Sequence, residues 1–195
     1  MAEATSQRKE KKEKKKKAIV KQIEIPEKVE VRIEEGTVFA KGQKGELSRR
    51  FPTQQIKIRK EDNKIIIQTE KASKREKKLI YTIIAHINNI IKGVQEGYVY
   101  ILTICSSHFP IKASVAGDKF EVKNFLGERK PRIVNIRKGV KITVDGNTVI
   151  VEGIDKEIVS QQAADIEQLC IIKNKDRRIF QDGIYITEKA GKSML

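Results

Sequence analysis

The stretch KITVDGNTVIVEGIDKEIVSQQAADIEQLC, Lys141–Cys170, holds the two patterns that decide the fold. Its first eleven residues place apolar side chains at alternate positions on either side of Asp145-Gly146-Asn147, a strong signal of a two-stranded β-hairpin. From Asp155 to Cys170 the apolar side chains recur every three or four residues, which predicts an amphipathic helix with Asp155 as its N-cap. A hairpin followed by a helix predicts a small α+β unit, an antiparallel sheet covered by one helix.

The same plan occurs earlier in the chain. Residues 56–67 alternate around a polar turn, and residues 74–92 carry isoleucines on one helical face before Gly93, which we expect to end that helix. The hairpins match at an offset of 84 residues and the helices at an offset of 79. At an offset of 82, KGQKGELSRRF (41–51) matches KNFLGERKPRI (123–133), and we interpret the shared Gly-Glu as one ancestral turn. We therefore predict two tandem duplicated α+β domains, 21–98 and 99–195.

The N-terminus differs from both repeats. Residues 1–20 are predicted to be a lysine-rich extension, and the first 17 carry eight basic and three acidic residues. Such a segment cannot bury enough apolar surface to offset the entropy of ordering, so we predict a disordered basic tail. Two interpretations stay open: a solubilising or nuclear-import-like tail, and an arm that orders on RNA.

Composition indicates the class of partner. The 195 residues include 41 basic and 26 acidic side chains, a formal net charge of +15. Such an excess of positive charge indicates a polyanionic binding partner. Nucleic acid is the leading candidate, because no apolar stretch is long enough for a membrane span and no long basic amphipathic helix carries large aromatic residues. Cys105 and Cys170 are too few and too far apart for a disulfide framework or a zinc site, so we expect reduced core thiols in a cytosolic protein.

Charge is segregated within the second repeat. Residues 123–141 carry seven basic side chains against Glu128 alone, residues 145–169 carry six acidic side chains against Lys156, and residues 173–178 are basic again. A solvated surface mixes its signs, whereas a phosphate-facing surface concentrates positive charge. The segment 123–141 is therefore predicted to contact RNA.

Catalytic patterns are absent from the sequence. It contains no P-loop, dinucleotide-binding fingerprint or HExxH motif. His86 is predicted to lie on a helix surface, and His108 to be a turn residue, because no third group that would orient a base can be named beside it. We predict no catalytic residue, no metal and no cofactor.

Four long runs resemble a known family. They are IEIPEKVEVRIEEGTVFAKGQKGELSRRF (23–51), SSHFPIKASV (106–115), VKNFLGERKPRIVNIRKGV (122–140) and IIKNKDRRIFQDGIYITEK (171–189). Together they resemble the eukaryotic and archaeal branch of a universal large-subunit ribosomal protein family, called L-six in bacteria and L-nine in eukaryotes. The resemblance covers about residues 22–190 and leaves out the lysine-rich extension.

The resemblance implies a structural ribosomal protein of two similar α+β domains, the C-terminal one being the main RNA anchor. It implies large-subunit rRNA near the sarcin–ricin loop and the stalk base as partner, with neighbouring ribosomal proteins and translation factors close by. It also implies a cytoplasmic, ribosome-bound protein that transits the nucleus or nucleolus during assembly. The alternative is a free nucleic-acid-binding regulator or a ribosome assembly factor.

Carried onto this chain, the resemblance and the charge pattern together predict a set of rRNA-binding residues. They are Lys123, Asn124, Arg129, Lys130, Arg132, Arg137, Lys138, Lys173, Asn174, Lys175, Arg177 and Arg178. Secondary RNA contacts are predicted for Lys41, Lys44, Arg49 and Arg50 and for Lys14, Lys15, Lys16 and Lys17.

Overall fold

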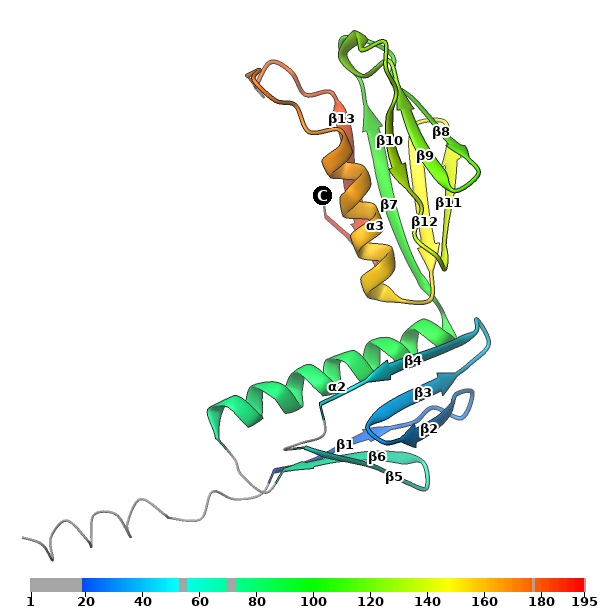
Figure 1. Cartoon of the computed structure of the whole chain (residues 1–195), viewed down its shortest axis with the longest axis vertical. Helices are drawn as coiled ribbons and strands as arrows, with labels where there is room; N and C mark the ends of the chain where they lie inside the picture. The colour runs from blue at the N-terminus through cyan, green and yellow to red at the C-terminus, as the bar shows by residue number, and fades with distance from the viewer. Residues whose placement is uncertain (1–18, 53–55, 70–72, 177, 195) are drawn as a thin grey trace, which may run out of the picture. The chain divides into compact units, whose positions relative to one another are not determined.

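The computed structural model describes residues 19–52, 56–69, 73–176 and 178–194. The chain divides into two compact units, the first ending at Ile91 and the second beginning at Lys92 (Figure 1). Residues 1–18 of the predicted extension lie outside the described residues, whereas Ile19 and Val20 belong to the first strand.

Unit 1 is built from six strands and most of one long helix, whose residues from Lys92 onward belong to unit 2. The elements are β1 (Ile19–Glu24), β2 (Glu30–Glu34), β3 (Thr37–Lys41), β4 (Glu46–Arg50), β5 (Lys57–Glu61), β6 (Lys64–Thr69) and α2 (Lys74–Gln95). The strands form two antiparallel three-stranded sheets, β1-β6-β5 and β2-β3-β4. Alternate residues such as Val31, Val38 and Ile65 are buried, and so are Ile80, Ile87 and other apolar residues of one face of α2.

Unit 2 repeats this plan and adds to it. Its elements are β7 (Tyr98–Cys105), β8 (Lys112–Ala116), β9 (Lys119–Lys123), a 3₁₀ turn (Phe125–Gly127), β10 (Arg132–Asn135), β11 (Val140–Asp145), β12 (Thr148–Gly153), α3 (Lys156–Leu169), β13 (Gly183–Lys189) and β14 (Lys192–Ser193). They form a five-stranded sheet, β11-β12-β7-β13-β14, and a three-stranded sheet, β10-β9-β8.

Strand order confirms the predicted duplication. The order β5-β6-β1 in unit 1 corresponds to β11-β12-β7 in unit 2, and β2-β3-β4 corresponds to β8-β9-β10. Registers agree as well: Ile58 lies opposite Ile67 in unit 1, as Ile142 lies opposite Val151 in unit 2. The α+β class is confirmed, although the strands of each unit divide between two sheets. Unit 2 also places β13 beside β7, where no alternating pattern had indicated a strand.

The shared Gly-Glu pair stands in different connections in the two units. Gly45 closes a four-residue link between β3 and β4, with the Gly42 N–H donating to the Gly45 carbonyl at 2.9 Å. Gly127 ends the 3₁₀ turn inside a longer link between β9 and β10. The pair therefore marks equivalent positions, but the interpretation of one common turn is wrong in detail because unit 2 has a longer loop.

The two helices match their predicted spans unequally. α3 begins as predicted, since the Asp155 carboxylate accepts the Glu157 N–H at 2.8 Å. Gly93 does not end α2, which continues to Gln95 and is followed by Gly97 with φ of 79°. A Cβ at Gly93 would lie 2.2 Å from the Ile154 carbonyl oxygen. Gly93 thus allows the Ile154 backbone to approach the helix closely, and Gly97 provides the left-handed residue after it.

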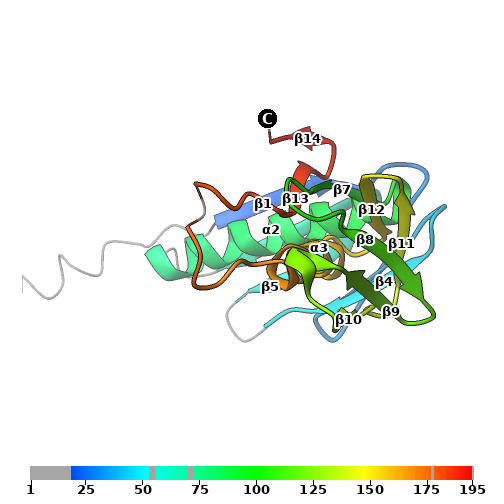
Figure 2. The ribbon, with the colours of Figure 1, turned by 90° about the horizontal axis from the view of Figure 1, so that it is seen from above.

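Unit 2 has one continuous core between its two sheets. Leu102 from β7, Phe120 from β9, Val149 from β12 and Ile166 from α3 are each fully buried in it. α3 contacts the five-stranded sheet on one side and β10 on another, and Figure 2 shows it among these strands. This arrangement leaves the loops at the end of α3 gathered at one end of the unit.

Candidate nucleic-acid interface

Three loops of unit 2 meet at one end of the unit, which we call the loop end. They are residues 106–111 after β7, residues 124–131 between β9 and β10, and residues 170–182 between α3 and β13. The Asn124 Nδ2 donates to the Pro110 carbonyl at 3.1 Å, and His108 contacts Asp182, so side-chain contacts join all three. In Figure 1 the loops after β9 and α3 lie at the upper end of this unit.

A buried carboxylate holds the first loop to the third. The side chain of Asp182 is only 1% exposed. It accepts hydrogen bonds from the backbone N–H groups of Ser107 and His108. It also accepts from the Ser107 hydroxyl at 3.2 Å and from His108 Nδ1 at 2.6 Å. Burial alone would raise the pKa of Asp182, but the hydrogen bonds from His108 and Ser107 outweigh it and bring the pKa to about 2. The charged carboxylate therefore orders the 106–111 loop.

Arg132 holds the second loop to the third. Its guanidinium pairs with both carboxylate oxygens of Glu128 at 2.6 and 2.8 Å and donates to the carbonyl oxygens of Leu169 at 2.7 Å and Ile171 at 3.3 Å. It also lies 4.2 Å from the centroid of the Phe125 ring. A cation is favourable at the carboxyl end of a helix such as α3. The hydrogen bond from Arg132 also lowers the pKa of Glu128, which keeps this pair charged.

The 124–131 loop has a defined backbone. Asn124, Leu126 and Gly127 adopt left-handed conformations with φ of 60°, 48° and 77°. Two of these are not glycine, so the surrounding contacts must outweigh the conformational cost. The buried Phe125 ring and the Arg132 clamp supply those contacts, and the loop is therefore organised before any ligand binds.

Several predicted RNA-binding residues already have partners inside the protein. Lys123 pairs with Glu121 at 3.4 Å, and the Arg137 guanidinium donates to Asp165 of α3 at 2.7 Å. Asp176 accepts from the Arg178 guanidinium at 2.8 Å. The charge segregation seen in the sequence is thus partly neutralised by these pairs, of which only Arg137–Asp165 joins two different elements. Exposed pairs of this kind are weak and can exchange for phosphate.

Other predicted residues are exposed and make no ion pair with any residue that the structure describes. These are Arg129, Lys130, Lys138 and Lys173. Asn174 is exposed with φ of 59°, the Lys175 ammonium lies 4.4 Å from the Phe180 ring centroid, and Arg177 lies outside the described residues. Of the described residues named here, all except Lys138 belong to the loop end. Lys138 and Arg137 stand in the β10–β11 connection, beside the part of α3 that carries Asp165.

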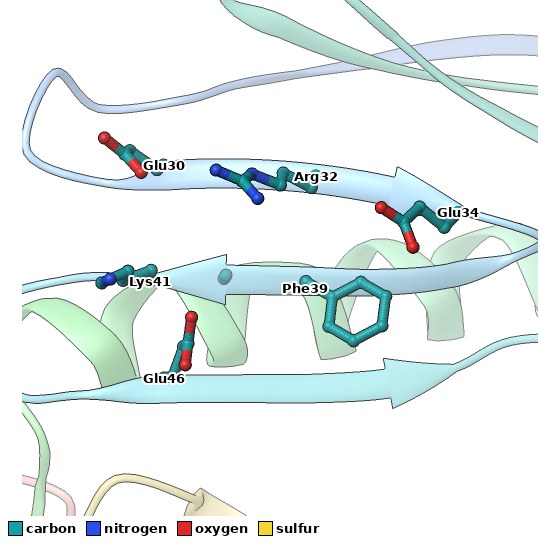
Figure 3. A pocket seen from close by; sticks show the side chains of 7 residues that line it. Glu30, Arg32, Glu34, Phe39, Lys41 and Glu46 are labelled. Carbon is teal, nitrogen blue, oxygen red and sulfur yellow. The ribbon is translucent and has the colours of Figure 1, made fainter.

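The secondary residues of unit 1 stand in a different setting. Outward-facing side chains of β2, β3 and β4 line a shallow pocket in which Arg32 and Lys41 alternate with Glu30, Glu34 and Glu46 around Phe39 (Figure 3). This surface mixes its signs, unlike a phosphate-facing one. The other three do not line this pocket: Lys44 and Arg50 are exposed, and Arg49 is half-buried over the Phe51 ring. Lys14, Lys15, Lys16 and Lys17 lie outside the described residues.

Comparison with known proteins identifies the family. The model of the family described as ribosomal protein L6 matches residues 25–97 and again residues 109–183. This chain belongs to the ribosomal protein L6 family. The double match reproduces the internal duplication, with the first copy largely in unit 1 and the second in unit 2.

Individual members of the L6 family are similar over most of the chain. Large ribosomal subunit protein uL6 of Methanocella arvoryzae is 47% identical over 172 residues, which cover 88% of this chain and 97% of the relative. The uL6 proteins of Aeropyrum pernix and Sulfurisphaera tokodaii are 49% and 45% identical over 172 residues, covering 88% of this chain and 94% and 92% of those relatives. The predicted family is confirmed, and so is its eukaryotic and archaeal branch, to which these archaeal relatives belong.

The L6 family is structural and non-enzymatic, which confirms the prediction that this chain is not an enzyme. Ser107, His108 and Asp182 nevertheless lie together as the members of a catalytic triad do. The Ser107 hydroxyl lies 3.1 Å from His108 Nδ1, the same ring nitrogen that contacts Asp182. A proton relay needs the serine on the other ring nitrogen, Nε2. His108 is a turn residue as predicted, although it does have the orienting group that the sequence did not reveal.

The cysteines differ from the expectation of two core thiols. Cys170 is buried, and burial raises its pKa to about 11, which keeps the thiol protonated and unreactive. Cys105 is exposed at the end of β7, where the outward face of the strand meets solvent. Within the part of the chain that the structure describes, no cluster of three metal-ligating side chains occurs and no helix is long and apolar enough to cross a membrane.

Sequence reasoning missed the aromatic residues of the loop end in this L6-family chain. The His108 and Phe180 rings stack with centroids 4.7 Å apart, and Phe109 is 47% exposed. The signal was available in the run SSHFP, where an aromatic residue stands in a polar turn. The charge pattern does not indicate this aromatic residue, because a count of charges gives no weight to aromatic side chains among the cations.

Proposed function

We propose that this chain is a structural constituent of the large ribosomal subunit that binds rRNA through the loop end of unit 2. Family membership supports the ribosomal assignment, since the relatives are large-subunit proteins. One observation carries the assignment of the surface: Arg129 and Lys130 stand without internal ion pairs, among the described residues, on a loop that the Arg132 clamp holds in place.

Preorganisation is the physical basis of this binding. Because the 124–131 loop is already ordered, little conformational entropy is lost when its cations meet phosphates. Arginine offers forked donors to phosphate oxygens, lysine offers a point charge, and each neutralised phosphate releases counterions. On A-form helices such contacts recognise shape and phosphate spacing rather than base sequence. Lys123 and Lys173, on the neighbouring strand and loop, would extend the contact along the RNA backbone.

Within the ribosome, the resemblance to the L-six and L-nine family favours a binding site on the rRNA near the sarcin–ricin loop and the stalk base. This position would place translation factors and neighbouring ribosomal proteins close to the chain. Unit 2 is the main anchor in this proposal, because the sheet surface of unit 1 mixes acidic and basic side chains.

Sedimentation of a cell lysate in high salt tests the proposal. A structural constituent stays with the large subunit under washes that other core ribosomal proteins survive. The double variant Arg129→Ala/Lys130→Ala should leave the subunit at lower salt than the wild type, whereas the control Lys44→Ala/Arg50→Ala should not. Release of the wild-type protein under a mild wash would contradict the proposal and favour an assembly factor or a free regulator.

A further inference from the structure

Phe109 presents an aromatic ring at the loop end. A Cβ built on Gly127 would meet three atoms of this ring at 3.5–3.8 Å, so the ring packs over the glycine backbone of the neighbouring loop. The side chain is nevertheless 47% exposed. Within the described part of the chain, no second ring and no cation stacks on Phe109. The ring is thus supported by backbone and still has surface open to solvent.

The residues under and beside this ring are held by contacts with neighbouring loops. Gly127 belongs to the loop with left-handed residues that the Arg132 clamp orders, and the Asn124 Nδ2 bond to the Pro110 carbonyl ties the residue after Phe109 to that loop. The residue before it, His108, is held by Asp182. Phe109 is therefore flanked on both sides by anchored residues, and its placement costs little entropy on binding.

Two cations follow closely in sequence the glycine on which the ring packs. Arg129 and Lys130 follow Gly127 by two and three residues. Their backbone therefore lies within roughly 7–11 Å of this glycine, over which the Phe109 ring packs. Both are exposed and make no ion pair among the described residues. The nearby Phe180 differs, because His108 and Lys175 already contact its ring.

We propose that Phe109 is a stacking platform for one unpaired RNA base, whose flanking phosphates are bound by Arg129 and Lys130. This rests on the proposed function and adds to it, since a clamp on duplex phosphates needs no exposed ring. Aromatic side chains amid positive charge are how proteins hold unstacked bases, and every base offers a π-face to such a ring. The loop end would then select a bulged or looped nucleotide within rRNA rather than continuous duplex.

An apolar side chain of a neighbouring protein is the other candidate to cover Phe109. The cations beside the ring disfavour it, because burying Arg129 and Lys130 against a protein without matching carboxylates would cost desolvation energy. An RNA base brings the phosphates that those cations need.

Tryptophan fluorescence can test the stacking directly, because the chain contains no tryptophan. Phe109→Trp introduces one reporter at the loop end, and Phe39→Trp, at the 38% exposed phenylalanine of β3, is the matched control. Each variant of the full chain is titrated with deproteinised large-subunit rRNA and, separately, with a fully paired RNA duplex. Thermal unfolding of each variant verifies the fold beforehand.

The proposal expects rRNA to quench the fluorescence of the Phe109→Trp variant but not that of the Phe39→Trp variant, and the duplex to quench neither. Phe109→Leu should weaken rRNA binding roughly tenfold, while Phe39→Leu should leave it unchanged. Unquenched fluorescence at position 109 would overturn the stacking site, and so would equal quenching by duplex. If Arg129→Ala/Lys130→Ala still weakens rRNA binding in that case, the proposed function stands without the base site. A blue shift at position 109 seen only in the assembled subunit would overturn the base site as well, by showing that a protein side chain covers the ring.

Discussion

Arg132 donates its Nη1 to the carbonyl oxygen of Leu169 at 2.7 Å, although 37 positions separate the two residues. The contact joins the β9–β10 loop to the carboxyl end of α3, where unsatisfied carbonyl groups need donors. Arg132 was predicted to bind RNA from its place in a basic run, and that prediction is still untested. Its internal contacts already make it the support of the loop that carries Arg129 and Lys130.

Arg132→Ala should therefore lower stability more than a surface arginine change does. The change removes the bidentate pair with Glu128 and the hydrogen bond to the Leu169 carbonyl. The free energy of unfolding should therefore fall by about 2–3 kcal/mol. The control Arg129→Ala removes an exposed side chain and should stay within about 0.5 kcal/mol of the wild type. Urea denaturation measures both, and equal losses would mean that the clamp contributes little.

Asp182→Asn should destabilise the protein in a pH-dependent way. Near neutral pH the loss should be about 2–3 kcal/mol, because a charged acceptor of several hydrogen bonds is replaced by a neutral amide. The folded-state pKa of about 2 lies below the unfolded value of about 3.9. The wild-type advantage is thus fully present above about pH 4 and is lost as the pH falls towards about 2.

Denaturation curves of the wild type and this variant between about pH 7 and pH 2 test that window. Asp176→Asn is the control, since Asp176 forms a surface pair with the exposed Arg178 and its loss should hardly change stability. A gap between wild type and Asp182→Asn that stays constant across the whole range would show that the charge of Asp182 is not the cause.

Gly93→Ala should destabilise unit 2 even though alanine is the better helix former. The new Cβ would lie 2.2 Å from the Ile154 carbonyl oxygen, so backbone must shift at a cost of about 3 kcal/mol. The control Gly146→Ala has open space but φ of 54°, and should cost only about 1 kcal/mol. Thermal unfolding compares the two, and a gain in stability for Gly93→Ala would refute the close packing.

The repeats and their registers were predictable because they follow from local periodicity. The pairs Ile58–Ile67 and Ile142–Val151 lie in hairpins whose turns are only a few residues long. β13 was not predictable in this way, since its place beside β7 depends on a contact between segments some 80 residues apart. The link from Asp182 to His108 likewise joins residues 74 positions apart.

The candidate site was predictable in outline but not in its division of roles. The basic runs indicated the loops that the structure brings together, because net charge can be counted along the chain. Which cations already have partners depends on three-dimensional contacts: Arg137 meets Asp165 across 28 positions, whereas Lys130 meets no acid among the described residues. The local sequence around Arg137 and Lys130 does not distinguish the paired side chain from the one that is unpaired within the described part of the chain.

The salt dependence of rRNA binding tests the central claim, that the loop end of unit 2 anchors the RNA. Two triple variants lose the same charge: Arg129→Ala/Lys130→Ala/Lys173→Ala in unit 2 and Lys41→Ala/Lys44→Ala/Arg50→Ala in unit 1. Affinity for deproteinised large-subunit rRNA is measured across a series of salt concentrations. We predict that the unit 2 variant lowers the slope of log K against log salt by about two to three, and the unit 1 variant by less than about one. Equal slopes for the two variants, or a larger change from unit 1, would contradict the claim.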